Sequence, residues 1–282
     1  MAITKVEDLN SLYNLIYEDA LFVARESNLM VGLVRNFAAT GYMARKIGIR
    51  PTISAQTKAE GVDFQDPTTF DKTLKATLTP AVVMAQAILT DEARDTDPDN
   101  ARQDAAQELG AAVATKIDTD LVGLFTSITE TKGTANYALS IAKCSAAVSV
   151  LRNNKAPNPL YFVMHPFGWQ DIWTELGQPT GTYAFLGDTA NQALKDYYVG
   201  NWLNATWFLN ANIAVDTSDD AYSAVFNPQA LGFDSRQEPT LEPERDASRK
   251  ATELNMSAGY AVGILRQEFA VALIHDATEP TG

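Results

Sequence analysis

Residues 97–128 read DPDNARQDAAQELGAAVATKIDTDLVGLFTSI, and this stretch decides the fold. Asp97 can cap free backbone N–H groups, Pro98 suits the first helical position, and Asp99 places negative charge near the positive helix end. Apolar side chains then recur at steps of three or four, at Ala105, Leu109, Val113, Ile117, Leu121, Leu124 and Ile128. The spacing predicts one amphipathic helix over residues 98–128. At a rise of about 1.5 Å per residue it would span roughly 45 Å, which suggests a spine that reaches across an assembly.

The composition indicates a folded, acidic protein. Hydrophobic residues make up 46% of the 282-residue chain, enough for one large or two modest domains. The formal net charge is −13, from 35 Asp and Glu against 22 Lys and Arg. This charge argues against a protein that wraps nucleic acid, because wrapping needs a basic footprint. It leaves open a container whose wall encloses nucleic acid without gripping it.

The cysteine count and the lengths of the apolar runs further limit the classes of protein to which the chain can belong. Cys144 is the only cysteine, so neither a disulfide framework nor a thiolate metal cluster is expected, and an intracellular origin is favoured. The amino terminus lacks a basic region followed by an apolar core, so a signal peptide is not expected. The long apolar run 81–89, broken by Gln86, is too short to cross a bilayer.

Residues 6–25 carry another helical stripe. It is formed by Leu9, Tyr13, Ile16, Ala20 and Val23. The residues that follow, to about Lys46, mix glycine with polar side chains and show no obvious core. The pattern favours an N-terminal arm over residues 1–46 that lies on another surface. An ordinary surface helix packed on its own body is an equally open interpretation.

Residues 47–80 change to the period of a β-ribbon. Val62 and Phe64, and later Ala76 and Leu78, alternate with polar residues. The middle of the segment, residues 65–68, contains Pro67 and the polar residues typical of a turn. We therefore expect an extended β-hairpin loop that projects from the body. Because an isolated hairpin is only marginally stable in water, it should lean on a neighbour.

The rest of the chain alternates helix and strand patterns. A helix is expected over 137–153, a buried strand over 160–164, a helix from Pro166 to Leu176, and a loop over 177–191. Strand-like runs follow at 206–209, 213–216 and 221–226, and residues 237–246 suit an edge strand or a crossover because they contain Pro239 and Pro243. Residues 252–276 predict two long strands covered by the long helix.

No constellation for catalysis or metal binding stands out. His165 and His275 are the only histidines, and no Gly-x-Ser-x-Gly nucleophile elbow accompanies them, so His165 is interpreted as a packing or turn residue. Cys144 lies on the apolar face of a predicted helix and is interpreted as a buried small hydrophobe. Asp95, Asp97 and Asp99 imitate the start of a calcium loop, but the glycine and glutamate that such a loop requires are missing. We therefore expect no catalytic residues, no cofactor and no metal, and the chain is not interpreted as an enzyme.

The projecting loop carries the first part of a resemblance to a known family. Glu60-Gly61, and then Asp66-Pro67 followed by Phe70, resemble the Glu-Gly and Pro-x-x-Phe elements of an extended loop in the major capsid proteins of tailed phages. Further matches are Thr90-Asp91-Glu92 before the long helix, residues 161–169 with Met164-His165-Pro166, and residues 259–274 with Arg266, Glu268 and Ala270. Their order over nearly the whole chain carries the resemblance, which is to the Hong Kong 97-type fold.

The resemblance implies a fold class and a domain division. The fold would be α+β, with an N-terminal arm (1–46), an extended β-hairpin loop (47–80) and a peripheral domain (81–132 and 236–282) that holds the spine helix 98–128. Residues 133–235 would form a central axial α/β domain.

The resemblance also implies a function and partners. The chain would be a major capsid protein whose hexamers and pentamers tile an icosahedral or prolate shell around double-stranded DNA. Its partners would be copies of itself, a scaffolding protein, a portal and a decoration protein, with packaged DNA bound without sequence specificity and no membrane. It would be located in the virion and assembled in the host cytoplasm.

Ten residues of the loop and the arm are the expected intersubunit contacts. They are Glu60, Asp63, Phe64, Asp66, Phe70, Lys72, Lys75, Leu9, Tyr13 and Ile16. Two alternatives stay open: an encapsulin-type compartment with the same fold, and, more remotely, a soluble α/β enzyme.

Overall fold

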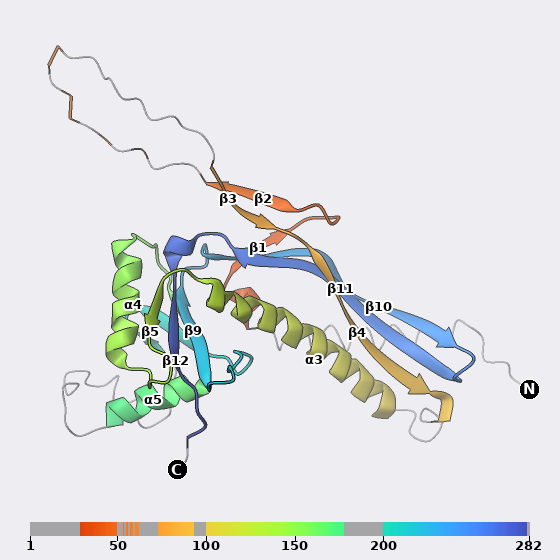
Figure 1. Cartoon of the computed structure of the whole chain (residues 1–282). Coiled ribbons are helices and arrows are strands. Elements are labelled where there is room, and N and C mark those ends of the chain that lie inside the picture. The colour runs from red at the N-terminus through yellow and green to blue at the C-terminus, as the bar shows by residue number, and fades with distance from the viewer. Residues whose placement is uncertain are drawn as a thin grey trace, which may run out of the picture.

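The computed structural model describes residues 29–49, 53, 55, 57–58, 60–61, 73–92, 100–177 and 200–280. Within these residues the chain forms two β-sheets, a two-stranded ribbon, one long helix and two shorter helices (Figure 1). The predicted arm helix over 6–25, the middle of the predicted loop and the capping residues Asp97, Pro98 and Asp99 lie outside the described residues.

The first sheet has four strands in the order β1-β10-β11-β4. Its members are β4 (Ala81–Thr90), β10 (Leu231–Asp246) and β11 (Ala251–Ile264), joined at one edge by β1 (Arg35–Ala38). β1 runs parallel to β10 and ends beside Ser235, so the outer half of β10 is an edge, as its prolines predicted. Pro239 lies within the register shift between Gln237 and Thr240, where the ladder does not need its missing N–H group.

The second sheet has six strands in the order β5-β12-β9-β6-β8-β7. The strands are β5 (Thr131–Gly133), β6 (Tyr161–Met164), β7 (Asn201–Trp202), β8 (Ala205–Leu209), β9 (Asp220–Phe226) and β12 (Ala270–Asp276). The helices α4 (Ile141–Asn153) and α5 (Pro166–Gly177) accompany this sheet (Figure 1). Both helices, the strand β6 and the strands β8 and β9 were predicted from the sequence.

The long helix α3 (Asn100–Gly123) lies along the first sheet and contacts β4 and β11 (Figure 1). Its predicted stripe is confirmed, because Leu109, Val113, Ile117 and Leu121 are buried. The predicted end at residue 128 was wrong, since the α-helix stops at Gly123 and continues as the 3₁₀ turn η2 (Leu124–Ser127). The Thr126 hydroxyl donates to the Gly123 carbonyl in this tighter turn.

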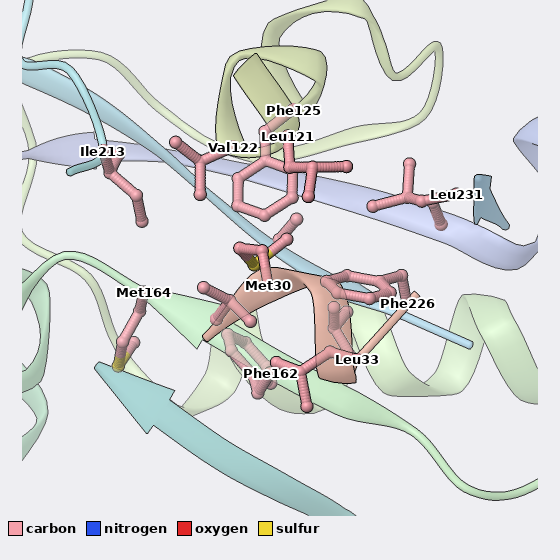
Figure 2. Close-up of a cluster of buried hydrophobic side chains, with 14 of the residues drawn as sticks. Met30, Leu33, Leu121, Val122, Phe125, Phe162, Met164, Ile213, Phe226 and Leu231 are labelled. Carbon is pink, nitrogen blue, oxygen red and sulfur yellow. The ribbon is translucent and has the colours of Figure 1, made fainter. Parts of the chain in front are cut away.

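Met30 lies at the centre of the main core. Met30 and Leu33, from the 3₁₀ turn η1 (Met30–Gly32) and its C-cap, point among Leu121, Phe125 and Phe226 (Figure 2). Met30 is fully buried, and β1 follows directly in the first sheet. Residues 30–38 are therefore part of the body. The sequence indicated only that the segment to residue 46 has no obvious core of its own, and it did not reveal the burial of Met30 and Leu33 in the main core. Methionine and leucine three residues apart on a short turn gave too weak a periodic signal.

The two closing strands separate into different sheets. β11 pairs with β10 and β4 under α3, as expected, whereas β12 pairs with β5 and β9 in the second sheet. The expectation that both strands lie together under the long helix was wrong. The 3₁₀ turn η4 (Gln267–Phe269) redirects the chain between them, and a turn of three residues leaves little trace in sequence periodicity.

Candidate assembly surfaces

The ribbon root is formed by the strands β2 (Arg45–Ile49) and β3 (Thr73–Leu78). They pair antiparallel from Arg45 opposite Leu78 to Ile49 opposite Thr73, so the hairpin predicted from residues 47–80 is confirmed at its base (Figure 1). Leu78 anchors the β3 side. It is fully buried against Ala261 and Leu265, with Phe37, Ile47 and Ala76 packed around them. The ribbon is thus attached to β11 by a small apolar cluster separate from the main core.

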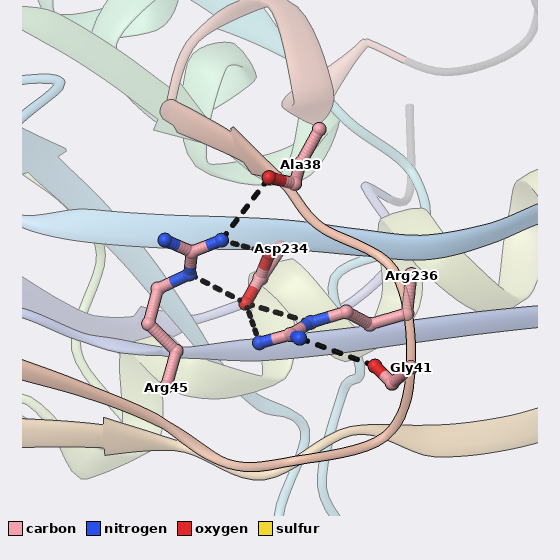
Figure 3. A network of polar contacts seen from close by, with 5 residues as sticks. All are labelled: Ala38, Gly41, Arg45, Asp234 and Arg236. Atoms are coloured by element: carbon pink, nitrogen blue, oxygen red, sulfur yellow. Dashed lines mark hydrogen bonds and ion pairs between the residues drawn. The ribbon is translucent and has the colours of Figure 1, made fainter.

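A buried carboxylate anchors the β2 side of the root. Asp234 on β10 is flanked by two guanidinium groups, with Arg45 Nε 2.8 Å and Arg236 Nη2 2.6 Å from its Oδ2 atom. The same guanidinium groups donate to the Ala38 carbonyl at the end of β1, from Arg45 at 3.2 Å, and to the Gly41 carbonyl in the β1–β2 connection, from Arg236 at 3.1 Å (Figure 3). We call these five residues the Asp234 clamp. Because the Asp234 side chain is fully buried, its charge depends on these ion pairs and not on water for its stabilisation.

Further contacts close the root around the clamp. The guanidinium groups of Arg35 and Arg45 lie 5.0 and 5.1 Å from the Phe37 ring centroid, within the range of a cation–π contact. The Tyr42 hydroxyl donates to Gln237 Oε1 on β10. The connection between β1 and β2 is therefore fixed to the first sheet along its length.

The strand β4 presents an exposed apolar strip. Its side chains alternate between the helix-facing side, where Val83, Ala85 and Ala87 pack on the core, and the opposite side. On that opposite side Val82, Met84 and Ile88 are 54%, 63% and 49% exposed, and the polar Gln86 lies between Met84 and Ile88. β4 is also the edge strand of its sheet, and no charged residue occurs between Ala81 and Thr90. Natural edge strands are normally protected by charge, proline or a bulge, so this edge has the features of a contact surface.

A polar junction fixes the point where the N-terminal segment enters the body. Asp118 in the middle of α3 is 1% exposed, and it accepts hydrogen bonds from the Met30 backbone N–H at 3.0 Å and from Asn212 Nδ2 at 2.9 Å. Asn210 Nδ2 donates to the same carboxylate. This junction ties the first residue of η1 to α3 and to the loop that follows β8.

His275 forms a buried structural contact with Ser223. His275 Nε2 lies 2.8 Å from the Ser223 hydroxyl oxygen, and His275 Nδ1 lies 2.8 Å from the Asp276 carbonyl oxygen. Because a carbonyl can only accept, Nδ1 carries the proton and Nε2 accepts from Ser223. Both His275 and Ser223 are fully buried, and a β carbon at Gly168 would lie 2.5 Å from the His275 ring. This Ser–His contact therefore has no room beside it for a substrate.

Burial also governs the protonation of these groups. It lowers the pKa of His275, outweighing the Asp276 carbonyl and the carboxylates of Asp171, Asp220 and Asp276, which act in the opposite direction. Burial, with a smaller contribution from His275, lowers the pKa of His165. His165 Nδ1 accepts from the Phe167 N–H at 3.3 Å, which confirms its interpretation as a turn residue. Burial raises the pKa of the Cys144 thiol far above its usual range, and the side chain is fully buried as predicted.

Only two of the ten predicted contact residues lie among the residues that the structure describes. Glu60 is exposed and lies in a turn with Gly61, and Lys75 belongs to β3. The others lie outside the described residues: Leu9, Tyr13, Ile16, Asp63, Phe64, Asp66, Phe70 and Lys72. The apolar strip and the Asp234 clamp were missed. The uncharged alternation over 81–90 could have indicated the strip, but nothing in the sequence pairs Asp234 with Arg45, 189 residues away.

The described residues hold neither a metal-binding cluster nor a membrane-spanning helix. Across the ranges given above, no three histidine, cysteine or acidic side chains gather in a group that could hold a metal ion. No helix in the described part of the chain is long and apolar enough to cross a membrane.

Comparisons with known proteins agree with this arrangement. Residues 86–273 match a family model described as phage capsid protein, which is more than half of the chain. No curated protein sequence matches the chain as a relative. The capsid structure of cyanophage P-SCSP1u is 13% identical with a TM-score of 0.68 and 89% of both chains covered. A structure from Mycobacterium phage Che8 is 17% identical with a TM-score of 0.65, covering 87% of this chain and 90% of that one. The SrpI encapsulin complex from Synechococcus elongatus is 12% identical with a TM-score of 0.59, covering 90% and 89%.

Proposed function

Because the chain belongs to the phage capsid protein family, we propose that its projecting ribbon and its apolar strip are the surfaces through which copies join. The chain is a major capsid protein of the tailed-phage type, a structural protein with the Hong Kong 97-type α+β fold, and it associates with itself to form the shell of the virion. The proposal concerns which residues make that association.

The proposal rests on two elements of one subunit that are only partly covered within the described structure, the two-stranded ribbon and the edge strand β4. A two-stranded ribbon leaves the body at β2 and β3, and two strands alone are marginal in water. The neighbouring edge strand β4 leaves Val82, Met84 and Ile88 uncovered within the described structure. Covering such apolar area stabilises a contact by roughly 25 cal/mol per Å², and many repeated contacts close a shell.

Charge supports the same surfaces. Two subunits of net charge −13 repel one another over most approaches. β4 is uncharged from Ala81 to Thr90, so a copy that docks there meets three apolar side chains and the amide of Gln86, which already holds the carboxylate of Glu253 on β11. We infer that the contact residues include the strip on β4 together with Glu60, Asp63, Phe64, Asp66, Phe70, Lys72 and Lys75 of the ribbon and Leu9, Tyr13 and Ile16 of the arm.

We also propose how the shell is organised. The copies form hexamers and pentamers of an icosahedral or prolate shell around double-stranded DNA, and the acidic wall lets the DNA slide because it offers no basic footprint. A scaffolding protein, a portal and a decoration protein are the further partners, and assembly takes place in the host cytoplasm. The proposed division keeps a peripheral domain over residues 81–132 and 236–282 and an axial domain over residues 133–235, with β12 of the former pairing with β9 of the latter.

Replacing the ribbon tests this role directly. Ile49 and Thr73 stand opposite one another in the ladder, so residues 50–72 can be exchanged for an Asn-Gly type I′ turn that closes the hairpin without changing the root. We expect a folded subunit with an unchanged circular dichroism spectrum that forms no closed shells by electron microscopy. Shells of normal diameter from this variant would refute the role of the ribbon.

An encapsulin-type compartment is the second candidate, because the SrpI encapsulin complex shares the fold. Purified particles separate the two functions. A phage shell assembled in cells that package DNA contains nuclease-protected double-stranded DNA, whereas a compartment contains protein cargo.

A further inference from the structure

We infer that the Asp234 clamp is a positioning device that fixes the direction in which the ribbon leaves the body, and thereby the curvature of the shell. The inference rests on the proposed role of the ribbon and adds to it the residue that sets its angle. Its basis is the way one buried carboxylate joins two parts of the chain that are far apart in the sequence, residues 38–45 and residues 234–236 (Figure 3).

The clamp connects the root to the body through the fully buried carboxylate of Asp234 and the two guanidinium groups paired with it. Arg45 is the first residue of β2, and its guanidinium holds both Asp234 Oδ2 at 2.8 Å and the Ala38 carbonyl at 3.2 Å. Arg236 is 5% exposed, and it holds Asp234 and the Gly41 carbonyl. One carboxylate thus orients two planar guanidinium groups, and these fix the Ala38 carbonyl at the end of β1 and the Gly41 carbonyl in the connection between β1 and β2.

The second attachment lies on the other strand of the ribbon. Leu78 of β3 is buried against Ala261 and Leu265, and it contributes packing without directional hydrogen bonds. Ile47 of β2 also packs on this cluster, and a ribbon held by such apolar packing alone could pivot about it. The clamp on β2 supplies the second fixed point, so that the two strands are held on both sides of the ribbon axis.

A small rotation of the ribbon at its root produces a large displacement at its far end. The chain between Ile49 and Thr73 contains 23 residues, residues 50–72. At about 3.3 Å per residue, half of them reach at most roughly 36 Å from the root, so a rotation of about 10° would displace the far end by about 6 Å. A contact between two copies tolerates much less than such a displacement. Loss of the clamp should therefore spoil the geometry of the shell before it unfolds the subunit.

Two variants and a matched control test the inference. Asp234→Asn keeps the shape of the side chain but turns an amide toward the two arginines. Arg45→Lys keeps the positive charge but loses the fork that spans Asp234 and Ala38. The control is Asp220→Asn, which alters a 3% exposed carboxylate in the second sheet that accepts from the Asn136 N–H at 2.6 Å.

The first measurement reports the direction of the ribbon in the unassembled subunit. Spin labels are placed at Lys58→Cys in the ribbon and Ser248→Cys at the far end of the first sheet, both exposed, while the buried Cys144 stays unlabelled. We expect a narrow distance distribution in the otherwise unchanged chain and in Asp220→Asn, and a distribution about twofold wider in Asp234→Asn and Arg45→Lys. Equal widths in all four proteins would overturn the inference.

The second measurement is the particle population by electron microscopy. We expect the fraction of subunits in uniform closed shells to fall about tenfold in the two clamp variants, because errors of angle multiply over many repeated contacts, and to stay near its normal value in Asp220→Asn. Uniform shells of normal diameter from both clamp variants would overturn the role in curvature. If even the unchanged chain formed no shells, the proposed function would fail, while the label distances would still test the clamp.

Discussion

Leu78 of β3 lies so close over Gly263 of β11 that a β carbon at Gly263 would stand 2.6 Å from Leu78 Cδ2. This contact explains why a glycine occupies a position inside a long strand, where it is otherwise unfavourable. The ribbon root can approach the first sheet only because β11 has no side chain at that point. The attachment of the ribbon therefore depends on both strands. The large side chain of Leu78 on β3 needs the space that Gly263 leaves on β11.

Gly263→Ala should destabilise the subunit by about 1–3 kcal/mol, because the added methyl group overpacks a site already filled by Leu78. Urea unfolding of the unassembled subunit measures the change. In a Leu78→Ala background, which itself costs about 2–5 kcal/mol, the cost of Gly263→Ala should disappear. The matched control is Gly123→Ala, where a β carbon meets nothing within 4 Å and φ is −58°, so stability should rise or stay the same. Equal effects of the two alanines would contradict this explanation.

Asp118→Ala should cost about 3 kcal/mol or more, because it removes the common acceptor of the Met30 N–H, Asn210 and Asn212 in a buried site. Thermal unfolding followed by circular dichroism would show the loss. Lys116→Ala on the same helix is the control, since Lys116 forms an exposed pair with Asp120 and should change stability by no more than about 0.5 kcal/mol. Similar midpoints for Asp118→Ala and the unchanged chain would rule out a structural role for this junction.

The sequence predicted those elements whose signal is local. The long helix, α4, α5 and the strand β6 all carry a continuous stripe or apolar run, and each was found within a few residues of its predicted bounds. The two-stranded root was also found, because alternation and turn chemistry both occur within one segment.

The predictions that failed concern features that depend on contacts between residues far apart in the sequence. Met30 was assigned to an arm because its burial comes from Phe125 and Phe226, which periodicity near residue 30 does not reveal. β12 was assigned to the wrong sheet because both sheets accept an apolar strand equally well, and only the turn at 267–269 separates it from β11. The Asp234 clamp belongs to the same class, since charged residues far apart in the chain give no sign of their partners.

Subunit stability should fall as the pH decreases from 7.5 to 5.5. His275 has a pKa lowered from its ordinary value of 6.5 by burial, so below that value the unfolded chain binds more protons than the folded one, and folding loses free energy. His165 acts in the same direction. Burial raises the pKa of Asp171, which favours the folded state at lower pH and opposes the histidines only toward the acid end. Urea unfolding at the two pH values should differ by about 1 kcal/mol or more, and His275→Gln, which cannot titrate, should reduce that difference. An undiminished difference in His275→Gln would exclude this histidine as the source.

Met84→Lys should leave the subunit folded and prevent its assembly. Met84 is 63% exposed on β4, so the substitution removes little packing, and the free energy of unfolding should change by no more than about 0.5 kcal/mol. In a contact between copies, however, the new ammonium group would have to lose its hydration beside Val82 and Ile88 without an acid on that strand to pair with it. Gel filtration and electron microscopy should then show free subunits or small oligomers. Val215→Lys is the control, because Val215 is 38% exposed but lies beside the second sheet, where it bridges to Ala221, away from β4. If Met84→Lys assembled as well as Val215→Lys, the apolar strip would have no part in joining the copies, and the ribbon alone would have to account for the shell.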